Sequence, residues 1–207
     1  MFKSLFGKKK KSGAPKRAKS FEEQMPQIKP RSLNITELQN DLKVAKAMHK
    51  DAKKPIDRDR AWRIFNVLLS CPAIEGNLQT ILNASHVNAA MAICLRREKK
   101  FKQALELDIS SMLFRVEYSQ RDLEIIDASN DSRPRELRPE APIPSASRNY
   151  IEAWKKDLGS SIGRLAKTNK NPELSAPLEK IISTQFHSGG YMTHCADAVK
   201  KAIESSA

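Results

Sequence analysis

The segment FKQALELDISSMLFRVEYSQRDLEIID, residues 101–127, decides the fold of this chain. Its apolar residues recur at alternating steps of four and three, which places their side chains on one face of an α-helix. This face consists of Leu105, Ile109, Met112, Val116, Ser119, Leu123 and Ile126. About three heptads is the minimum length for a coiled coil, so the segment predicts a coiled-coil seam or a long helix in a bundle, and we favour the bundle. The acidic residues that we expect mostly off this face, in solvent, are Glu117, Asp122, Glu124 and Asp127.

Residues 32–98 show the same helical spacing in shorter segments. The pattern predicts four helices, with Pro55 and Pro72 ending the first two and the others lying at about 75–84 and 86–98. The capping residues that we expect are Asn34 or Thr36 for the first helix and Asp57 or Asp59 for the second. Glycine is sparse, at 7 of 207 residues, which argues against a turn-rich all-β fold. We therefore predict an all-α fold, either a helical bundle or an irregular array of helical hairpins.

A proline-rich segment, residues 129–148, interrupts the helical pattern and contains four prolines. Such a composition is typical of a linker or a long surface loop. It separates a main helical domain, 32–128, from a small C-terminal helical subdomain, 149–207, in which Trp154 lies on an apolar face. The subdomain has room for three helices, broken by turns near 169–172 and 189–190. We expect it to pack on the main domain, because so small a unit is marginal alone.

Positive charge is concentrated in the first 31 residues. They contain ten Lys or Arg and two acidic residues, a net charge of +8 out of +13 for the whole chain. Three prolines and few apolar residues accompany the lysines after residue 7. This composition predicts a flexible, disordered basic tail over 1–31. The tail is therefore the main electrostatic feature of the sequence.

The tail opens with an apolar turn directly before a run of lysines. Phe2, Leu5 and Phe6 have the spacing of one helical face. The lysines that follow at once are Lys8, Lys9, Lys10 and Lys11. Aromatic residues enter the headgroup–acyl boundary of a bilayer, and each nearby lysine contributes about 1 kcal/mol on an anionic surface. Because ordering the tail opposes this gain, the pattern predicts a reversible, salt-sensitive contact with an anionic membrane surface.

Three other interpretations use the same tail. The segment KKKKSGAPKRAK also fits a nuclear-localisation signal or a nucleic-acid-binding arm, which leaves the three apolar residues unexplained. An organelle-targeting presequence is compatible with the lack of acidic residues before Glu22, although such segments favour arginine. The third interpretation is a solubilising tail whose apolar residues pack on the protein's own body.

A second basic cluster lies in the predicted helical body. It crosses a predicted helix–turn–helix junction and consists of Arg96, Arg97, Lys99, Lys100 and Lys102. A solvated turn explains it without any ligand. The functional alternative is contact with phosphate groups of nucleic acid or lipid. Together with the tail, this cluster supports a nucleic-acid-binding protein as the alternative function.

The stretch NAAMAICLRREKKFKQALELDISSMLFRV lies within residues 85–118, which resemble a single tetratricopeptide-type helix pair. Ala104 matches the small residue at which the two helices of that family cross closely. Ala92 matches the small position of the first helix. The large positions are matched by Met91 and Leu95, and Phe101 matches the aromatic residue that opens the second helix.

Three positions depart from the tetratricopeptide pattern. Asn88 stands where the family often has tryptophan, Asp108 where it has an aromatic residue, and Val116 where it has proline. No second copy follows or precedes at the repeat spacing, whereas about three neighbours are needed to bury a continuous core. The resemblance implies a scaffold that binds peptides or proteins without catalysis.

Three potential metal ligands lie close together in QFHSGGYMTHCAD, namely His187, His194 and Cys195. Imidazole and thiolate are zinc ligands, but this spacing matches no standard structural zinc pattern. A fourth ligand would have to come from Asp197, Cys71 or Cys94. The alternatives are two loop histidines beside a half-buried cysteine, which we favour, and a Cys/His nucleophile pair. Three cysteines without a CxxC spacing predict reduced thiols in a cytosol-like compartment.

The sequence contains no nucleotide-binding glycine motif, no secretory signal and no run of about 18 apolar residues. It predicts a non-enzymatic helical interaction or scaffold protein that needs no cofactor and is tethered by its tail to an anionic membrane surface. The expected partner is a protein, with nucleic acid as the alternative. The expected location is the cytoplasm, at a membrane periphery, and the nucleus or nucleoid under the alternative. The 105–126 face also allows self-association.

Overall fold

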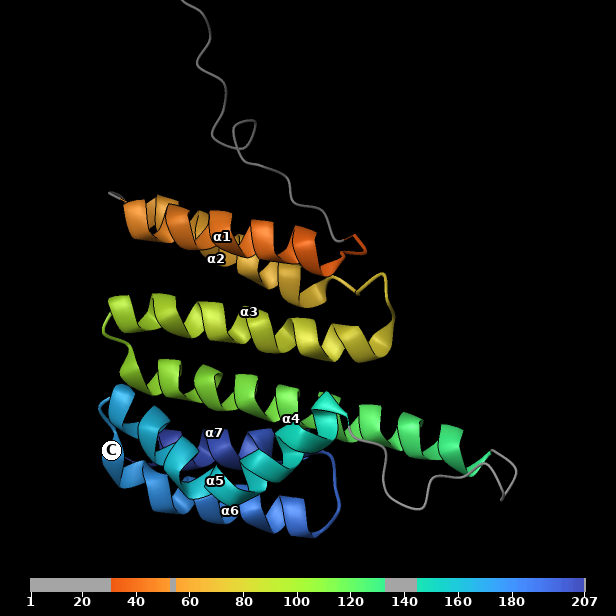
Figure 1. The fold of residues 1–207 in the computed structure, drawn as a ribbon. Helices are drawn as coiled ribbons and strands as arrows, with labels where there is room; N and C mark the ends of the chain where they lie inside the picture. Colours follow the sequence, from red (N-terminus) through yellow and green to blue (C-terminus); the bar gives the residue numbers. More distant parts are fainter. Residues whose placement is uncertain (1–30, 53–54, 133–144, 207) are drawn as a thin grey trace, which may run out of the picture.

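The computed structural model describes residues 31–52, 55–132 and 145–206. It confirms the all-α prediction, since seven α-helices pack together and no strand forms within the described residues (Figure 1). The helices are α1 (Ile35–Asp51), α2 (Pro55–Ser70), α3 (Asn77–Arg97), α4 (Phe101–Asp131), α5 (Ala146–Thr168), α6 (Ser175–His187) and α7 (Ala196–Glu204). Two short 3-10 helices, η3 (Pro172–Leu174) and η4 (Met192–Cys195), precede α6 and α7. The predicted tail contacts at residues 2–11 lie outside the described residues.

The first helix begins where its sequence predicts. Asn34 caps α1 through a reciprocal pair of hydrogen bonds with Glu37, at 2.9 and 3.1 Å. The expected cap of α2 at Asp57 or Asp59 is wrong, because α2 already begins at Pro55. Proline is well tolerated in the first turn, where its missing N–H has no helical partner. Asp57 lies in that first turn, where its negative charge interacts favourably with the positive end of the helix dipole.

A single helix, α3, replaces the two that we expect over 75–84 and 86–98. Ser85 lies in the middle of α3 and is buried, so the polar residue does not break the helix. Its hydroxyl donates to the carbonyl oxygen of Ser111 in α4 at 2.8 Å. The apolar pattern is interrupted at Ser85 and suggests the end of a helix there, because the pattern does not reveal that Ser111 of the next helix is its partner. The α3–α4 pair is the most extensive helix contact in the structure.

Two buried apolar clusters lie on opposite sides of the α3–α4 pair. The first joins α1, α2 and α3 around residues such as Phe65, Leu38 and Val87. The second joins α4 with the C-terminal helices α5, α6 and α7. Figure 1 shows α3 and α4 between these two groups of helices. The C-terminal helices therefore share their core with α4, which belongs to the predicted main domain.

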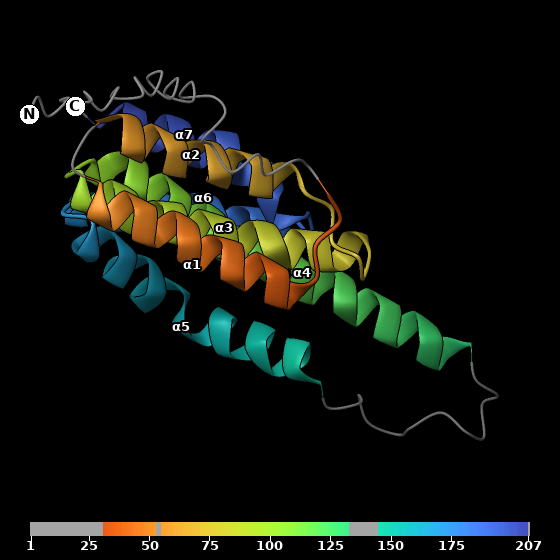
Figure 2. The same cartoon turned by 90° about the horizontal axis from the view of Figure 1, so that it is seen from above.

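The apolar face of α4 packs on helices of the same chain, as a bundle requires. Leu105, Ile109 and Val116 are buried in the second cluster, and Met112 packs partly buried against it. Figure 2 shows that the C-terminal part of α4 extends past the neighbouring helices. Ile125 lies in this part and is 59% exposed.

Glu117 corrects the prediction that the acidic residues of α4 face solvent. It is only 4% exposed, whereas Glu124 and Asp127 are exposed as expected. The backbone N–H of Thr193 donates to Glu117 at 3.1 Å, and Arg121 pairs with the same carboxylate at 2.8 Å. A buried carboxylate is tolerated when it is paired and hydrogen-bonded in this way. Glu117 therefore fastens η4 to α4.

Replacement of Ile109 by alanine should destabilise the protein strongly, because Ile109 is fully buried between α4 and the C-terminal helices. We expect a loss of about 2–5 kcal/mol in the free energy of unfolding, measured by urea denaturation. Ile125→Ala makes the same change in the same helix at an exposed position and should cost less than about 0.5 kcal/mol. Similar losses for both variants would contradict the placement of the core.

Candidate functional site

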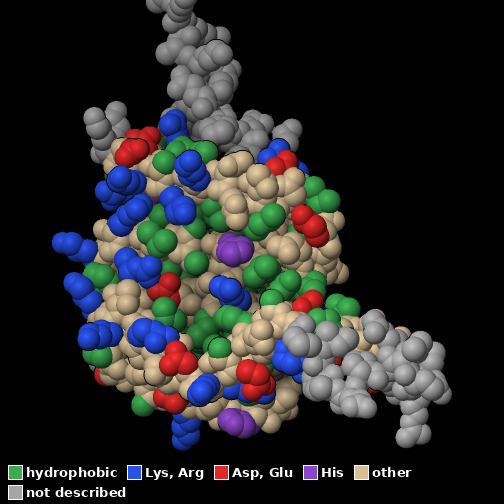
Figure 3. Space-filling model, viewed as in Figure 1, with side chains coloured by type: hydrophobic (Ala, Val, Ile, Leu, Met, Phe, Trp, Pro, Cys, Tyr) green, Lys and Arg blue, Asp and Glu red, His purple; other side chains and the backbone are tan. Residues whose placement is uncertain are grey.

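The structure brings the predicted basic cluster together around the α3–α4 turn. Arg97, Lys99 and Lys100 are exposed there, while Arg96 and Lys102 are half-buried. Figure 3 shows Lys and Arg side chains gathered on the side of the molecule where this turn lies. Lys99 adopts a left-handed backbone conformation with φ 61°, which ends α3. The amide of Lys100 then bonds to the carbonyl oxygen of Leu95 at 3.0 Å, a common way to close a helix C-terminus.

Several of these cations already have partners within the protein. Arg96 pairs with Asp108 of α4, which also accepts from Asn169 at 2.7 Å. Lys100 pairs with Glu98 at 2.6 Å, and Lys102 donates to the carbonyl oxygen of Ser206. These contacts link the turn to α4 and to the C-terminal helices. The charge that the turn presents to a phosphate group is consequently smaller than the sequence suggests.

Glu98 is the centre of a polar network that joins three helices. His49 of α1 lies with its Nε2 2.7 Å from Oε1 of Glu98, and Trp62 of α2 donates to the same oxygen at 3.1 Å. Burial alone would raise the pKa of Glu98, but hydrogen bonds from Lys100, His49 and Trp62 lower it to about 2. The Glu98 side chain is only 10% exposed. The network therefore stabilises the ionised carboxylate and holds α1 and α2 to the end of α3.

Glu98 should make the stability of the protein fall in acid. Its pKa drops from 4.5 to about 2 in the folded state, so its contribution is present above about pH 4.5 and is lost as the pH falls toward 2. The full contribution is on the order of 3 kcal/mol. We expect Glu98→Gln to lose clearly less stability than the parent between about pH 5 and about pH 2.5, measured by urea unfolding.

The matched control for this acid dependence is Glu75→Gln, because Glu75 is exposed on the α2–α3 connection. This variant should keep the pH dependence of the parent protein. An identical pH dependence for Glu98→Gln and the parent would show that the network does not favour the ionised carboxylate.

The three candidate metal ligands, for which we favour a role without metal, do not form a cluster. His187 ends α6, and its Nδ1 lies 2.6 Å from the carbonyl oxygen of Ser183. His194 and Cys195 lie in η4, where Cys195 is buried in the second apolar cluster. Residues 31–52, 55–132 and 145–206 contain no group of three or more His, Cys, Asp or Glu side chains placed to hold a metal ion. The arrangement therefore gives no support to a zinc site.

The cysteines are buried, and none of the three forms a disulfide. Burial raises the pKa of Cys94 and of Cys195 to about 11. The thiol of Cys195 donates to the carbonyl oxygen of Met192 at 3.0 Å. Because the thiolate is the nucleophile, this environment does not activate Cys195.

The thiols of Cys94 and Cys195 should react slowly with Ellman's reagent in the native protein. At about pH 8, a pKa of about 11 leaves on the order of one thiolate per thousand thiols. In a Cys71→Ser variant, which leaves only Cys94 and Cys195, we expect the native reaction to be at least ~100-fold slower than in denaturant. Complete reaction of the native protein within seconds would contradict the burial of these thiols.

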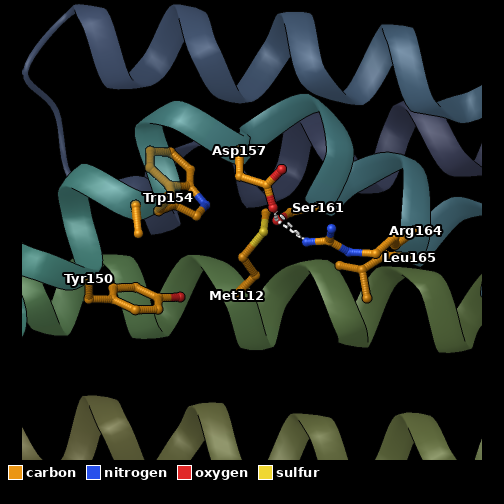
Figure 4. Close-up of a pocket in the computed structure, with 8 residues that line it drawn as sticks. Met112, Tyr150, Trp154, Asp157, Ser161, Arg164 and Leu165 are labelled. Atoms are coloured by element: carbon orange, nitrogen blue, oxygen red, sulfur yellow. Dashed lines mark hydrogen bonds and ion pairs between the residues drawn. The ribbon is translucent and has the colours of Figure 1, made fainter.

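A pocket of about 360 Å³ lies between α4 and α5 (Figure 4). Its apolar lining comes from Met112 of α4 and from Ala153 and Leu165 of α5. Its polar lining comes from Tyr150, Trp154, Asp157, Ser161 and Arg164. Such a combination of an apolar wall and a few polar groups is typical of ligand sites. The apolar spacing of the sequence does not predict this pocket.

The pocket lies at a kink in α5. Asp157 has a non-helical backbone, with φ −118° and ψ 16°, inside the helix. The Gly159-Ser160 pair follows, and such pairs are a known cause of helix kinks. Gly159 lies beside Glu179 of α6, since a Cβ atom at this position would lie 2.8 Å from Oε1 of that exposed side chain. The Gly159-Ser160 pair after an apolar helical face is the one sequence signal that could indicate this site.

Trp154 is the least satisfied polar side chain of the pocket. It is only 5% exposed, and its Nε1 has no hydrogen-bond partner among the described residues. An unsatisfied buried donor costs about 1–3 kcal/mol. Figure 4 shows the indole nitrogen on the side of the ring that faces Met112 and Asp157. Phe186 of α6 contacts the ring of Trp154 at a centroid distance of 5.0 Å and helps to fix its orientation.

The pKa shifts of Asp157 and Tyr150 both favour their usual charge states at neutral pH. Arg164 donates to Asp157 at 2.7 Å, and this hydrogen bond lowers the pKa of the Asp157 carboxyl. Burial raises the pKa of Tyr150, whose ring also carries the guanidinium of Arg115 at 4.8 Å. The pocket therefore offers hydroxyl and indole donors beside an ion pair with no net charge.

Comparisons of the chain with protein-family models, with curated proteins and with solved structures give no match. The tetratricopeptide resemblance thus stays a prediction. The structure does place Ala92 and Ala104 fully buried in the α3–α4 hairpin, as a close helix crossing requires. Within the part of the chain that the structure describes, no helix has the length and apolar character to cross a membrane.

Proposed function

We propose that this protein is a non-enzymatic helical interaction protein that its N-terminal segment tethers reversibly to an anionic membrane surface. The observation that carries the proposal is the apolar turn of Phe2, Leu5 and Phe6 beside the lysines at 8–11. Apolar insertion and lysine–phosphate attraction act together on an anionic bilayer. The helical body is then free to bind a protein partner.

The attachment point of the tail supports this proposal. The amide of Leu33 donates to the carbonyl oxygen of Pro72 at 3.0 Å, and Leu33 accepts from the amide of Ile74 at 3.1 Å. Leu33 itself is 1% exposed in the first apolar cluster. The start of the folded body is therefore held firmly to the α2–α3 connection. A tether needs such a fixed attachment to hold its cargo at a surface.

An apolar side chain lies beside this attachment point. Ile74 is 61% exposed, and its amide bonds to Leu33 as described. If residues 2–11 bind the bilayer, the end of the helical body that contains Leu33 and Ile74 would approach the bilayer first. Ile74 would then add an apolar contact at the membrane interface.

Replacement of Phe2, Leu5 and Phe6 together by serine should weaken membrane binding. We expect at least ~10-fold weaker partitioning to vesicles of phosphatidylcholine with about 30% phosphatidylserine, because the apolar contribution is lost. Co-sedimentation of the full chain with vesicles measures this effect. Added salt should weaken binding of the parent protein, and vesicles of phosphatidylcholine alone should bind it poorly. Equal sedimentation of the variant and the parent would remove the proposal.

Nucleic-acid binding is the second candidate function, and the exposed basic turn at Arg97, Lys99 and Lys100 favours it. The same triple serine variant separates the two functions, because phosphate contacts of the lysines do not need the apolar turn. Nucleic-acid binding should then be unchanged in the variant and should fall steeply with salt. The second function would be favoured if the variant still binds duplex DNA and the parent protein does not bind vesicles.

A further inference from the structure

The lining of the pocket between α4 and α5 contains a buried donor and an acceptor that are three residues apart in α5. The donor is Nε1 of Trp154, which has no partner among the described residues and faces into the pocket (Figure 4). The acceptor is the carboxylate of Asp157, whose Oδ2 accepts from Arg164 at 2.7 Å and from Ser161 at 3.3 Å. A carboxylate has about four acceptor sites, so these bonds leave capacity for a further donor.

The charge balance of the pocket favours neither a bound anion nor a bound cation. Asp157 and Arg164 form an ion pair, so a bound carboxylate would meet the carboxylate of Asp157 and a bound cation would meet the guanidinium of Arg164. A neutral group that both accepts and donates hydrogen bonds avoids either repulsion. The amide group has this property, because its oxygen accepts and its nitrogen donates.

We propose that this pocket binds a neutral amide that is attached to an apolar group. The amide oxygen accepts from Trp154 Nε1, and the amide N–H donates to Asp157. The apolar group lies on Met112 and Leu165, which form the wall of the pocket. This chemistry occurs in a peptide segment of a protein partner and in a small acylated amine. The inference is independent of the tail and of membrane binding.

Access to the donor requires one side chain to move. Trp154 Nε1 is covered by its surroundings, so an amide oxygen must displace a neighbour to reach it. Met112 is the lining residue best suited to this movement, because its unbranched thioether side chain adapts easily. The ring of Trp154 keeps its place, since Phe186 contacts it from α6.

The test uses the two tryptophans of the full chain, which each give one indole N–H signal in a ¹H–¹⁵N NMR spectrum. Trp62 is an internal control, because its indole already donates to Glu98. Phenylacetamide and phenylacetate are matched probes that differ in charge at the same position. We expect phenylacetamide to shift the Trp154 signal saturably and to leave the Trp62 signal in place. Phenylacetate should require at least ~5-fold higher concentration for the same shift.

Asp157→Asn tests the acceptor at a half-buried position whose side chain is 47% exposed, so the change should leave the fold intact. It should weaken phenylacetamide binding at least ~3-fold and reduce the preference over phenylacetate. Trp154→Phe identifies the Trp154 signal and should weaken binding at least ~10-fold, read from backbone signals of α4 and α5. N-acetyl-phenylalanine methylamide is the peptide probe. If it saturates the shift of the Trp154 signal at a lower concentration than phenylacetamide does, the ligand is a peptide. If phenylacetamide saturates the shift at the lower concentration, the ligand is a small acylated amine.

Two results would overturn the inference. The first is a Trp154 signal that moves with neither amide probe at concentrations up to about 20 mM, where millimolar binding would be visible. The second is an equal response to phenylacetamide and phenylacetate in both the parent protein and Asp157→Asn, since charge would then play no part in recognition.

Discussion

The burial of one face of α4 is the constraint on which the other helices depend. Leu105, Ile109, Leu113 and Val116 lie inside the second apolar cluster, where α5, α6 and α7 close around them. The opposite side of the same helix packs along α3, and Leu107 contacts the first cluster. Because α4 takes part in both clusters, a change in its position would move both halves of the bundle.

Hydrogen bonds between residues far apart in the sequence fix helix positions that apolar packing alone leaves open. Glu98 holds His49 and Trp62, and Glu117 holds Thr193. Each carboxylate joins helices that are far apart in the sequence. Such contacts are expensive to leave incomplete in a buried environment, so they favour one arrangement of the helices over the alternatives that apolar packing alone would permit.

The helices were predictable because their signals are local. The spacing in residues 101–127 indicates α4, and Asn34 with Glu37 indicates the start of α1. The predictions for Ser85 and Glu117 were wrong because each residue has a partner far away in the sequence. Ser85 is bonded to Ser111, and Glu117 is covered by η4. Trp154 was predictable as a core residue, but its unpaired nitrogen and the pocket beside it depend on where α5 bends, which only the three-dimensional arrangement shows.

The start of α5 is held on α4 independently of the segment that connects them. Ser147 donates to Asp122 at 2.6 Å, and Arg148 pairs with Asp127 at 2.9 Å. Both ends of residues 133–144 are therefore set by contacts outside that segment. These two contacts, and not the length of the chain between residues 132 and 145, therefore set where α5 begins on α4.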